Sequence, residues 1–392
     1  MFLLNILKQS TIVHLCFAIS YFTSGLLLNL VQAILYFGLK PFNKALYRKI
    51  NYYLSYSFSC QLVFMSEWWA GIKMFIYVKK DEYDKYYGKE HGYLIMNHSY
   101  EIDWLMGWQF CDGIGVLGNC KAYAKKSIQY MPPIGWMWKF SEFVFLERSF
   151  EKDKETIKTQ IAEICDYPDP VWLLLTPEGT RFTPTKHEAS LNFAKEKNLP
   201  LLKHHLTPRT KGFTTSLQHF RGKIPVIYNI QLAFEKDSKV PPTLMSMLYG
   251  KPIQAHLYIQ RIPVEQIPED EAAAAKWLHD LFVTKDKMME SFKNTGDFFL
   301  ESGVERVEPF VRQRRIYSLL NTLSWAVITL TPMLYYLVGL LLSGRLLYFF
   351  IGSSIIAVFY VLLQKSISMS QISRGSSYGT EKKIETPVKN SN

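Results

Sequence analysis

The chain has 392 residues, a formal net charge of +11, and 48% hydrophobic residues. Nucleic-acid-binding proteins rarely combine a basic charge with long uncharged apolar runs. We therefore exclude nucleic acid as a partner and expect an anionic membrane surface or an anionic substrate. The five cysteines are scattered and form no Cys-x-x-Cys pair. This pattern predicts neither a disulfide framework nor a zinc site, and it favours a reduced, cytosol-facing domain.

Residues 1–66 are predicted to anchor the chain in a membrane. Between Lys8 and Lys40, only His14 has a side chain that could carry a charge. This interval exceeds the roughly 20 residues that span a bilayer. We predict a transmembrane helix over residues 12–37, with a buried globular helix as the alternative. Residues 50–66 are also uncharged but rich in Tyr and Ser, which favours a re-entrant or interfacial helix.

Residues 67–300 are predicted to form one α/β domain, because short apolar runs alternate with polar, helix-compatible stretches. Strands are expected at residues 93–96, 143–146, 171–175, 226–232 and 255–262, and helices at residues 151–165, 186–197 and 270–287. This alternation predicts a largely parallel sheet flanked by helices. In such sheets the chemistry lies beyond the carboxyl ends of the strands.

Residues 301–365 are predicted to form a transmembrane hairpin, with apolar runs at 319–342 and 346–363 around a turn that contains Arg345. The basic residues that flank the membrane segments place the central domain in the cytosol. The chain's one Asn-x-Ser/Thr sequon starts at Asn97, and this topology predicts that it carries no glycan. Residues 366–392 are polar and are predicted to be disordered.

The first candidate motif follows the strand at residues 93–96 and spells NHSYEID from Asn97 to Asp103. Five residues turn a continuous helix by about 140°, so His98 and Asp103 can meet only if His98 lies in a turn before the helix. Asp103 would then fix the imidazole tautomer and leave the other nitrogen as a general base for a substrate hydroxyl. The alternatives are a capped loop histidine, or Ser99 as a nucleophile without the usual GxSxG context.

The second candidate motif follows the strand at residues 171–175 and spells TPEGTR from Thr176 to Arg181. A turn with Pro and Gly can present backbone amides outward, and the planar fork of Arg181 suits phosphate. Glu178 fits beside phosphate only if it binds a hydroxyl or braces an arginine. The alternative is an ordinary turn with a surface salt bridge. His204 and His205 lack a third ligand at useful spacing, so we interpret both as surface residues and predict no metal site.

In this order, these motifs resemble those of the glycerolipid acyltransferase family. Over roughly residues 60–290 they are most similar to the lysophosphatidic acid (1-acylglycerol-3-phosphate) acyltransferases. Residues 208–213, together with the C-terminal hairpin, resemble the gamma/delta branch of that family, which is placed in endoplasmic reticulum membranes. Two positions differ from the family pattern: Gly is usual where Glu142 stands, and Phe is frequent where Thr176 stands.

The resemblance implies transfer of a fatty acyl group from acyl-CoA, the co-substrate, to the sn-2 hydroxyl of lysophosphatidic acid, without a further cofactor. It implies a multi-pass protein of the endoplasmic reticulum membrane whose other partners are membrane lipids. His98 is then the general base and Asp103 its partner. The implied substrate-binding residues are Glu178, Gly179, Thr180 and Arg181 for the glycerol phosphate, with Arg148 and Lys211 assisting, and Pro225 for the acyl chain.

Three alternatives stay open. The acceptor can be another lysophospholipid, such as lysocardiolipin or lysophosphatidylinositol. The chain can be a non-catalytic lipid-binding membrane protein on the same fold. It can also be a membrane-bound hydrolase that uses water as the acceptor.

Overall fold

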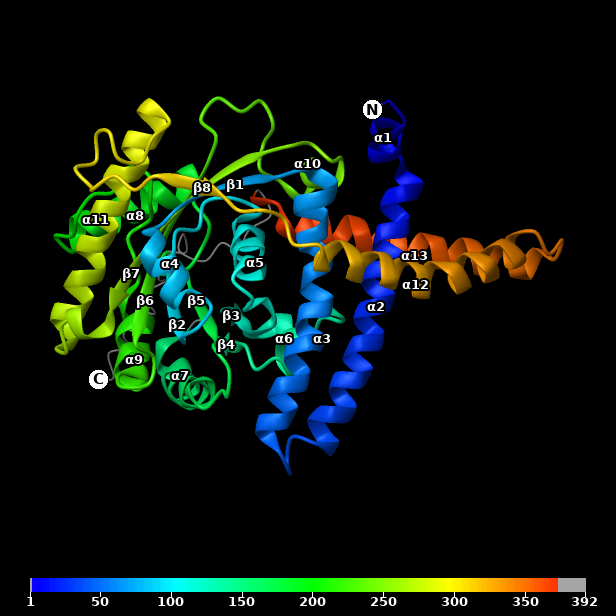
Figure 1. Cartoon of the computed structure of the whole chain (residues 1–392), viewed down its shortest axis with the longest axis horizontal. Helices are drawn as coiled ribbons and strands as arrows, with labels where there is room; N and C mark the ends of the chain where they lie inside the picture. The colour runs from blue at the N-terminus through cyan, green and yellow to red at the C-terminus, as the bar shows by residue number, and fades with distance from the viewer. Residues whose placement is uncertain (1, 148, 373–392) are drawn as a thin grey trace, which may run out of the picture.

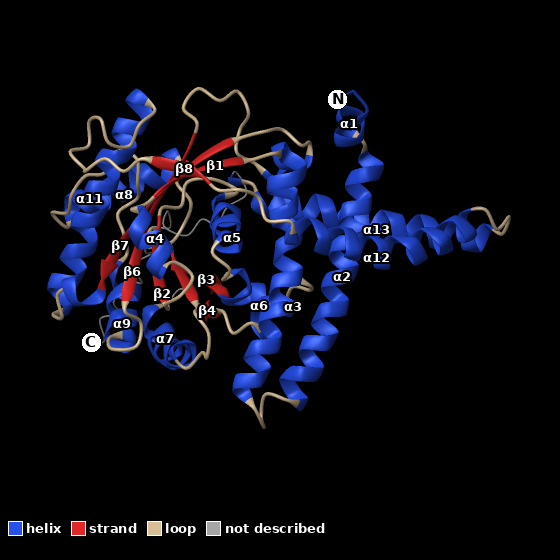
Figure 2. Cartoon of the chain, in the orientation of Figure 1, coloured by secondary structure: helices blue, strands red, loops and turns tan. Residues whose placement is uncertain are grey.

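A mostly parallel eight-stranded sheet forms the centre of the computed structural model, which describes residues 2–147 and 149–372 (Figures 1 and 2). The strand order is β4-β3-β5-β2-β6-β7-β1-β8, and only β7 against β6 and β8 against β1 are antiparallel. This sheet confirms the predicted α/β class. The strands are β1 Lys73–Tyr77, β2 Gly92–Met96, β3 Cys120–Lys125, β4 Val144–Leu146, β5 Trp172–Leu175, β6 Val226–Phe234, β7 Gln254–Pro263 and β8 Pro309–Val311.

Helices cover both faces of the sheet, and a group of them extends away from it on one side (Figure 2). The α-helices are α1 Phe2–Gln9, α2 Thr11–Gly38, α3 Lys44–Phe64, α4 Lys80–Tyr86, α5 Asp103–Gly113, α6 Ile134–Phe140, α7 Phe150–Cys165, α8 Pro184–Glu196, α9 Thr210–Phe220, α10 Leu244–Leu248, α11 Glu271–Thr295, α12 Tyr317–Leu341 and α13 Leu346–Ser370. A π-helix, Met65–Ala70, continues α3. The predicted domain boundary at residue 66 therefore falls inside a continuous helical run.

The strand β2 shows why the sheet lies in the middle of the molecule. All five of its residues are buried. Tyr93 and Ile95 pack into the apolar layer formed with α7, α9 and α11. Leu94 and Met96 pack into the opposite layer, formed with α5 and the end of α3. An apolar run without polar alternation is what a parallel strand buried on both faces requires.

The sheet register brings the two motif-bearing loops to the same end of the sheet. In the parallel pairing of β2 and β5, Ile95 lies opposite Leu175. The carboxyl ends of both strands therefore meet, and the loops that follow them emerge side by side.

Asn97, the residue directly after β2, is hydrogen-bonded to the neighbouring strand β6. Its buried amide donates to the Leu232 carbonyl at 3.0 Å and accepts from the Leu232 N–H at 2.8 Å. A glycan on Asn97 is incompatible with this fold, so an unmodified sequon does not report which side of a membrane the domain faces.

Within the described residues, three helices are long and apolar enough to cross a membrane: α2, α12 and α13. The helix α2 buries polar groups and exposes apolar ones. Ser24 and Gln32 lie buried and hydrogen-bond to Gln61 and Asn51 of α3. The large exposed side chains of α2 are apolar: Ile12, Leu26, Leu27, Leu30, Val31, Ile34 and Phe37. This arrangement suits contact with lipid, where polar groups must find partners inside the protein.

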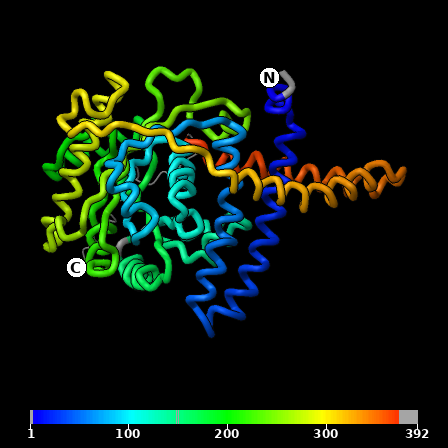
Figure 3. Tube along the Cα trace, in the orientation of Figure 1, coloured from blue at the N-terminus to red at the C-terminus, as the bar shows by residue number. Residues whose placement is uncertain are grey.

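The hairpin of α12 and α13 extends outward from the domain and returns to it (Figure 3). The helix α13 continues past the predicted end of the hairpin at residue 365, as far as Ser370. Tertiary contacts explain the extra turn. Ile367 is buried in the main apolar core, and Ser370 bonds to residues of the domain. Residues 373–392 of the predicted tail lie outside the described part of the chain.

The hairpin and the N-terminal helices run in different directions. The helix α12 packs against both α2 and α3, and in Figure 1 α2 lies crosswise to the hairpin. If α12 and α13 are perpendicular to the plane of a membrane, α2 is therefore not perpendicular to it.

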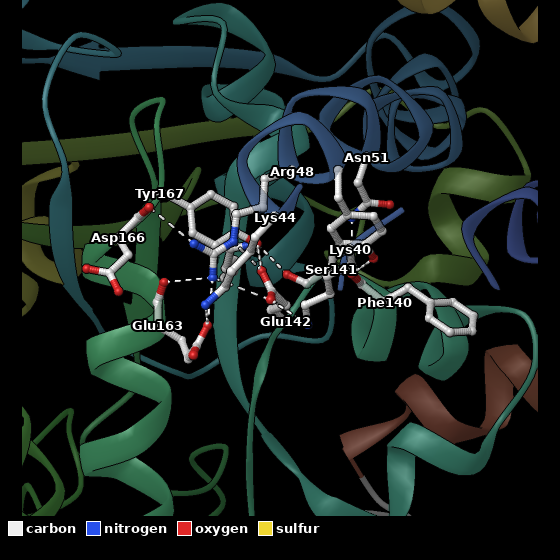
Figure 4. Close-up of polar contacts among 12 residues, drawn as sticks. Lys40, Lys44, Arg48, Asn51, Phe140, Ser141, Glu142, Glu163, Asp166 and Tyr167 are labelled. Carbon is white, nitrogen blue, oxygen red and sulfur yellow. Dashed lines mark hydrogen bonds and ion pairs between the residues drawn. The ribbon is translucent and has the colours of Figure 1, made fainter. Parts of the chain in front are cut away.

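A buried ion-pair network attaches α3 to the domain (Figure 4). The guanidinium of Arg48, 3% exposed, bonds Glu142 and Glu163, each at 2.9 Å, and donates to the Asp166 carbonyl at 3.2 Å. Lys40 adds a second ion pair with Glu142 at 2.8 Å. The network joins the N-terminal helices to the loop before β4 and to the end of α7.

The backbone of Glu142 explains why glycine suits this position. Its φ of 58° lies in the left-handed region, which costs a non-glycine residue roughly 1–2 kcal/mol. Burial alone would raise the pKa of Glu142. Hydrogen bonds from Arg48, Lys40 and Tyr167, together with the charge of the buried Lys121, instead lower it to about 2. The ionised carboxylate therefore offsets the backbone strain by holding α3.

We expect Arg48→Met to lower the free energy of unfolding by about 3–5 kcal/mol, because it leaves the largely buried Glu142 carboxylate with fewer partners. Thermal unfolding in detergent measures the change. The matched control is Lys44→Met, which removes a half-exposed pair with Glu163 worth less than about 1 kcal/mol. Equal effects of the two substitutions would show that the network does not anchor α3.

Candidate active site

The imidazole of His98 and the carboxylate of Asp103 are brought together as the first motif predicts. Nδ1 of His98 lies 2.8 Å from Oδ2 of Asp103. The Asp103 side chain is 1% exposed, whereas that of His98 is 26% exposed. Because the carboxylate only accepts, Nδ1 carries the proton and Nε2 keeps its lone pair. The partly exposed imidazole can therefore take a proton from an incoming group.

Asp103 is held by more than the histidine. It is the first residue of α5. Its carboxylate accepts backbone N–H groups from Ser99 at 3.1 Å, from Tyr100 at 3.2 Å and from Trp104 at 2.9 Å. These donors are part of the loop and the first helical turn, whose free amides favour an anion. Asp103 thus orients His98 and fixes the path of the loop that carries it.

Glu178 joins the loop after β5 to the loop after β2. Its carboxylate, 2% exposed, accepts the His98 N–H at 2.8 Å and the Leu206 N–H at 2.9 Å. The Phe182 N–H in turn donates to the His98 carbonyl at 2.9 Å. The substrate contact expected for Glu178 is therefore replaced by another role, since both carboxylate oxygens face the protein interior. Glu178 braces the histidine loop.

The rest of the second motif forms a tight turn with basic side chains beside it. The Gly179 N–H bonds to the Thr176 carbonyl at 2.9 Å, and Gly179 has a φ of 70°, a conformation that glycine adopts without strain. Beyond it, the buried Lys186 donates to the Thr180 hydroxyl at 2.6 Å. The sequence analysis missed Lys186, although it lies on the helix that follows the motif. Arg181 is half-buried and brings a second positive charge to the same turn.

The end of the hairpin of α12 and α13 reaches these two loops. Arg181 donates to the carbonyl of Ser370, the last residue of α13. The Ser370 hydroxyl donates to the Glu101 carbonyl, and the Ile372 N–H donates to the Glu101 carboxylate, both at 3.2 Å. The site therefore lies beside the inner end of a helix able to cross a membrane.

Of the remaining expected residues, Pro225 stands apart from this cluster. Pro225 directly precedes β6, whose first residue Val226 pairs with Gly92 at the amino end of the sheet. It is thus a strand length, about 15 Å, from the end of β2, so the expected acyl-site role is not supported. Lys211 lies in the first turn of α9, two residues after Arg209, whose N–H bonds to the Pro177 carbonyl. Arg148 lies outside the described residues.

Burial bears on two further expectations. The Ser99 hydroxyl is buried and has no hydrogen-bond partner among the described residues, so no base activates it as a nucleophile. His205 was wrongly interpreted as a surface residue. It is fully buried, and its Nδ1 lies 2.9 Å from Asp286. The described part of the chain contains no group of three or more His, Cys, Asp or Glu residues placed to hold a metal ion.

Two protein families match successive parts of this chain. Residues 77–227 match the family described as Acyltransferase, and residues 246–325 match the family described as Acyltransferase C-terminus. The first range contains both motifs and the loops around them.

Similar proteins cover nearly the whole chain. It is 41% identical over 381 residues to 1-acyl-sn-glycerol-3-phosphate acyltransferase gamma of Homo sapiens, covering 97% of this chain and 98% of that protein. It is also 41% identical to the delta protein of Homo sapiens, covering 96% and 97%. The crystal structure of the 1-acyl-sn-glycerophosphate acyltransferase PlsC from Thermotoga maritima is 16% identical. It covers 69% of this chain and 96% of that one, with a TM-score of 0.39.

We expect Glu178→Gln to lower kcat about 10- to 100-fold, because the amide can accept only one of the two backbone N–H groups and the histidine loop loses its alignment. The KM for the acceptor should change less than about twofold, since Glu178 does not face it. Steady-state kinetics measure both values. The control is Glu188→Gln, an exposed carboxylate on α8. A raised KM with an unchanged kcat would contradict this role and indicate that Glu178 contacts the substrate.

Proposed function

Because the chain belongs to the acyltransferase family, we propose that it transfers a fatty acyl group from acyl-CoA to the sn-2 hydroxyl of lysophosphatidic acid, which yields phosphatidic acid. The observation that carries this proposal is the His98–Asp103 pair, 2.8 Å apart, on a loop tied to Glu178 of the second motif. The relatives named 1-acyl-sn-glycerol-3-phosphate acyltransferase support the choice of acceptor, since 41% identity extends over nearly the whole chain.

The proposed mechanism needs one base and no enzyme nucleophile. Nε2 of His98 takes the proton of the acceptor hydroxyl as the oxygen attacks the thioester carbonyl. The buried Asp103 carboxylate stabilises the imidazolium that forms. When the tetrahedral intermediate collapses, the carbon–sulfur bond breaks and the CoA thiolate leaves, taking the proton back from His98. The free hydroxyl of the lysolipid thus fills the role that serine has in a catalytic triad.

The acceptor's phosphate is proposed to bind at Arg181, with Thr180 and Lys186 beside it. In the structure the Arg181 guanidinium donates a hydrogen bond to a backbone carbonyl at the C-terminal end of α13. The last carbonyls of a helix carry partial negative charge, so this contact has the same sign as phosphate. The phosphate and the Ser370 carbonyl then compete for Arg181, while the acyl chain stays in the lipid around the hairpin.

The protein is proposed to lie in the endoplasmic reticulum membrane with its catalytic domain in the cytosol. The five cysteines are free thiols, which suits a reducing compartment. The basic residues before α12, such as Arg312 and Arg314, favour a cytosolic start of that helix.

A panel of lysolipids tests the acceptor. Purified protein given acyl-CoA should release CoA thiol fastest with lysophosphatidic acid, and His98→Ala should be slower by about 10²–10⁴-fold while it still folds. Faster turnover of lysocardiolipin or lysophosphatidylinositol would show that this other lysolipid is the preferred acceptor. Thiol release without any lysolipid would indicate a hydrolase. No release with any acceptor, or wild-type turnover by His98→Ala, would contradict the proposed chemistry.

A substitution at Arg181 tests the phosphate site. We expect Arg181→Ala to raise the KM for lysophosphatidic acid about 10- to 100-fold, the loss of roughly 1.5–3 kcal/mol from a hydrogen bond to a charged group. Arg181→Lys keeps the charge but not the planar fork, so its KM should lie between those of the wild-type protein and Arg181→Ala. Arg306→Ala, which removes a partly exposed pair with Asp297, is the control. An unchanged KM in Arg181→Ala would place the phosphate elsewhere.

A further inference from the structure

The segment between α8 and α9 is tied to α11 by one carboxylate. Oδ2 of Asp286 accepts the Lys203 N–H at 2.7 Å, and Oδ1 accepts the His204 N–H at 2.8 Å. Nδ1 of the His205 ring lies 2.9 Å from the same Oδ1. Three donors from consecutive residues therefore converge on Asp286. A carboxylate with this set of partners fixes both the backbone path and the side chain of the segment.

The same segment reaches the catalytic loop one residue later. The N–H of Leu206 donates to Glu178, and the other oxygen of Glu178 accepts the N–H of His98. A chain of hydrogen bonds and a short stretch of backbone thus runs from α11 to His98. Its end at α11 is rigid, because the helix spans 25 residues and buries Leu278 and Phe282 completely.

All the charged groups along this path are shielded from solvent. Glu178 is 2% exposed, Asp286 is 9% exposed, and His205 and Lys285 are fully buried. The ammonium of Lys285 donates to the Asn229 side chain at 3.0 Å and to a β6 carbonyl. None of these groups can reach a substrate, and the proposed reaction uses none of them. Burying four ionisable groups together is costly unless they pair, so their presence calls for a role.

We propose that Asp286 and His205 are positioning residues that hold the catalytic His98 in place through Glu178. The inference rests on the proposed role of His98 as the base. When the anchor at Asp286 is weakened, the 203–206 segment shifts and the Leu206 N–H leaves Glu178. The carboxylate then no longer holds the His98 loop on the line between the acceptor hydroxyl and Asp103. A displacement of about 1 Å at such a group costs on the order of 100-fold in rate.

The charges around Glu178 give this role a distinct pH signature. His98, His205 and Lys285 face Glu178 from three different elements, and Asp286 lies behind His205. Burial raises the pKa of the Glu178 carboxyl, and His205 opposes that rise most strongly. Protonation of Glu178 takes away an acceptor and releases a backbone N–H, so kcat falls as the pH drops through the raised pKa of this carboxyl.

The first experiment compares two carboxylates on one helix. We expect Asp286→Asn to lower kcat about 10- to 100-fold and to leave the KM for lysophosphatidic acid within about twofold. The matched control is Glu290→Gln, one turn further along α11, whose carboxylate pairs with the side chains of Lys203 and His204. A rise in KM that matches the fall in kcat, or an equal loss of kcat in Glu290→Gln, would overturn the proposal.

Rescue and hydrogen exchange complete the test. His205→Asn keeps an N–H donor near the position of Nδ1 and should retain most of the activity that His205→Leu loses. In Asp286→Asn, amide exchange in residues 97–104 should accelerate, while the apolar core of the sheet stays protected. Indistinguishable His205 variants, or unchanged exchange, would overturn the proposal. Wild-type turnover by His98→Ala would instead contradict the proposed function, so the two failures are separable.

Discussion

The carboxylate of Glu178 is the interaction on which the arrangement of the site depends. It accepts one backbone N–H from the loop after β2 and another from the segment before α9, so three separate stretches of chain meet at one buried group. Neutral side chains of similar size offer fewer acceptors in the same space. The charge is costly to bury, and His205 and Lys285 lie close enough to offset that cost. The imidazole of His98 inherits its position from this cluster and its tautomer from Asp103.

The helices outside the sheet place this cluster beside lipid. Polar side chains of α2, such as Gln32, turn inward onto α3, and large apolar side chains such as Leu30 and Ile34 are exposed, which is unusual for a water-soluble helix. Arg48 secures α3 to the domain through Glu142 and the end of α7. The returning helix α13 ends against Arg181 and the Glu101 loop. In the proposed reaction, an acceptor whose single acyl chain stays in the membrane would find donors for its headgroup at this end of the hairpin.

Sequence patterns located β2, β4, β5, β6 and β7 and missed β1, β3 and β8. The runs at β2, β5 and β6 stand out because both faces of each strand are buried. The strand β3 reads as polar, since Lys121 lies within it. Its ammonium is nonetheless buried and bonds to the Ser141 carbonyl. The role of Glu178 was missed for the same reason: its partners are backbone N–H groups from distant residues, which leave no mark on the local sequence.

The sequence by itself determined the α/β class, the apolar segments and the pair of motifs with His98, Asp103 and Arg181, because periodicity and residue chemistry are local properties. Only the tertiary structure decided which groups meet. It moved Pro225 to the opposite edge of the sheet, turned Glu178 inward and buried His205 against Asp286. These outcomes depend on strand register and on hydrogen bonds between residues up to 81 positions apart, and the chain forms such contacts only when the sheet and its helices pack together.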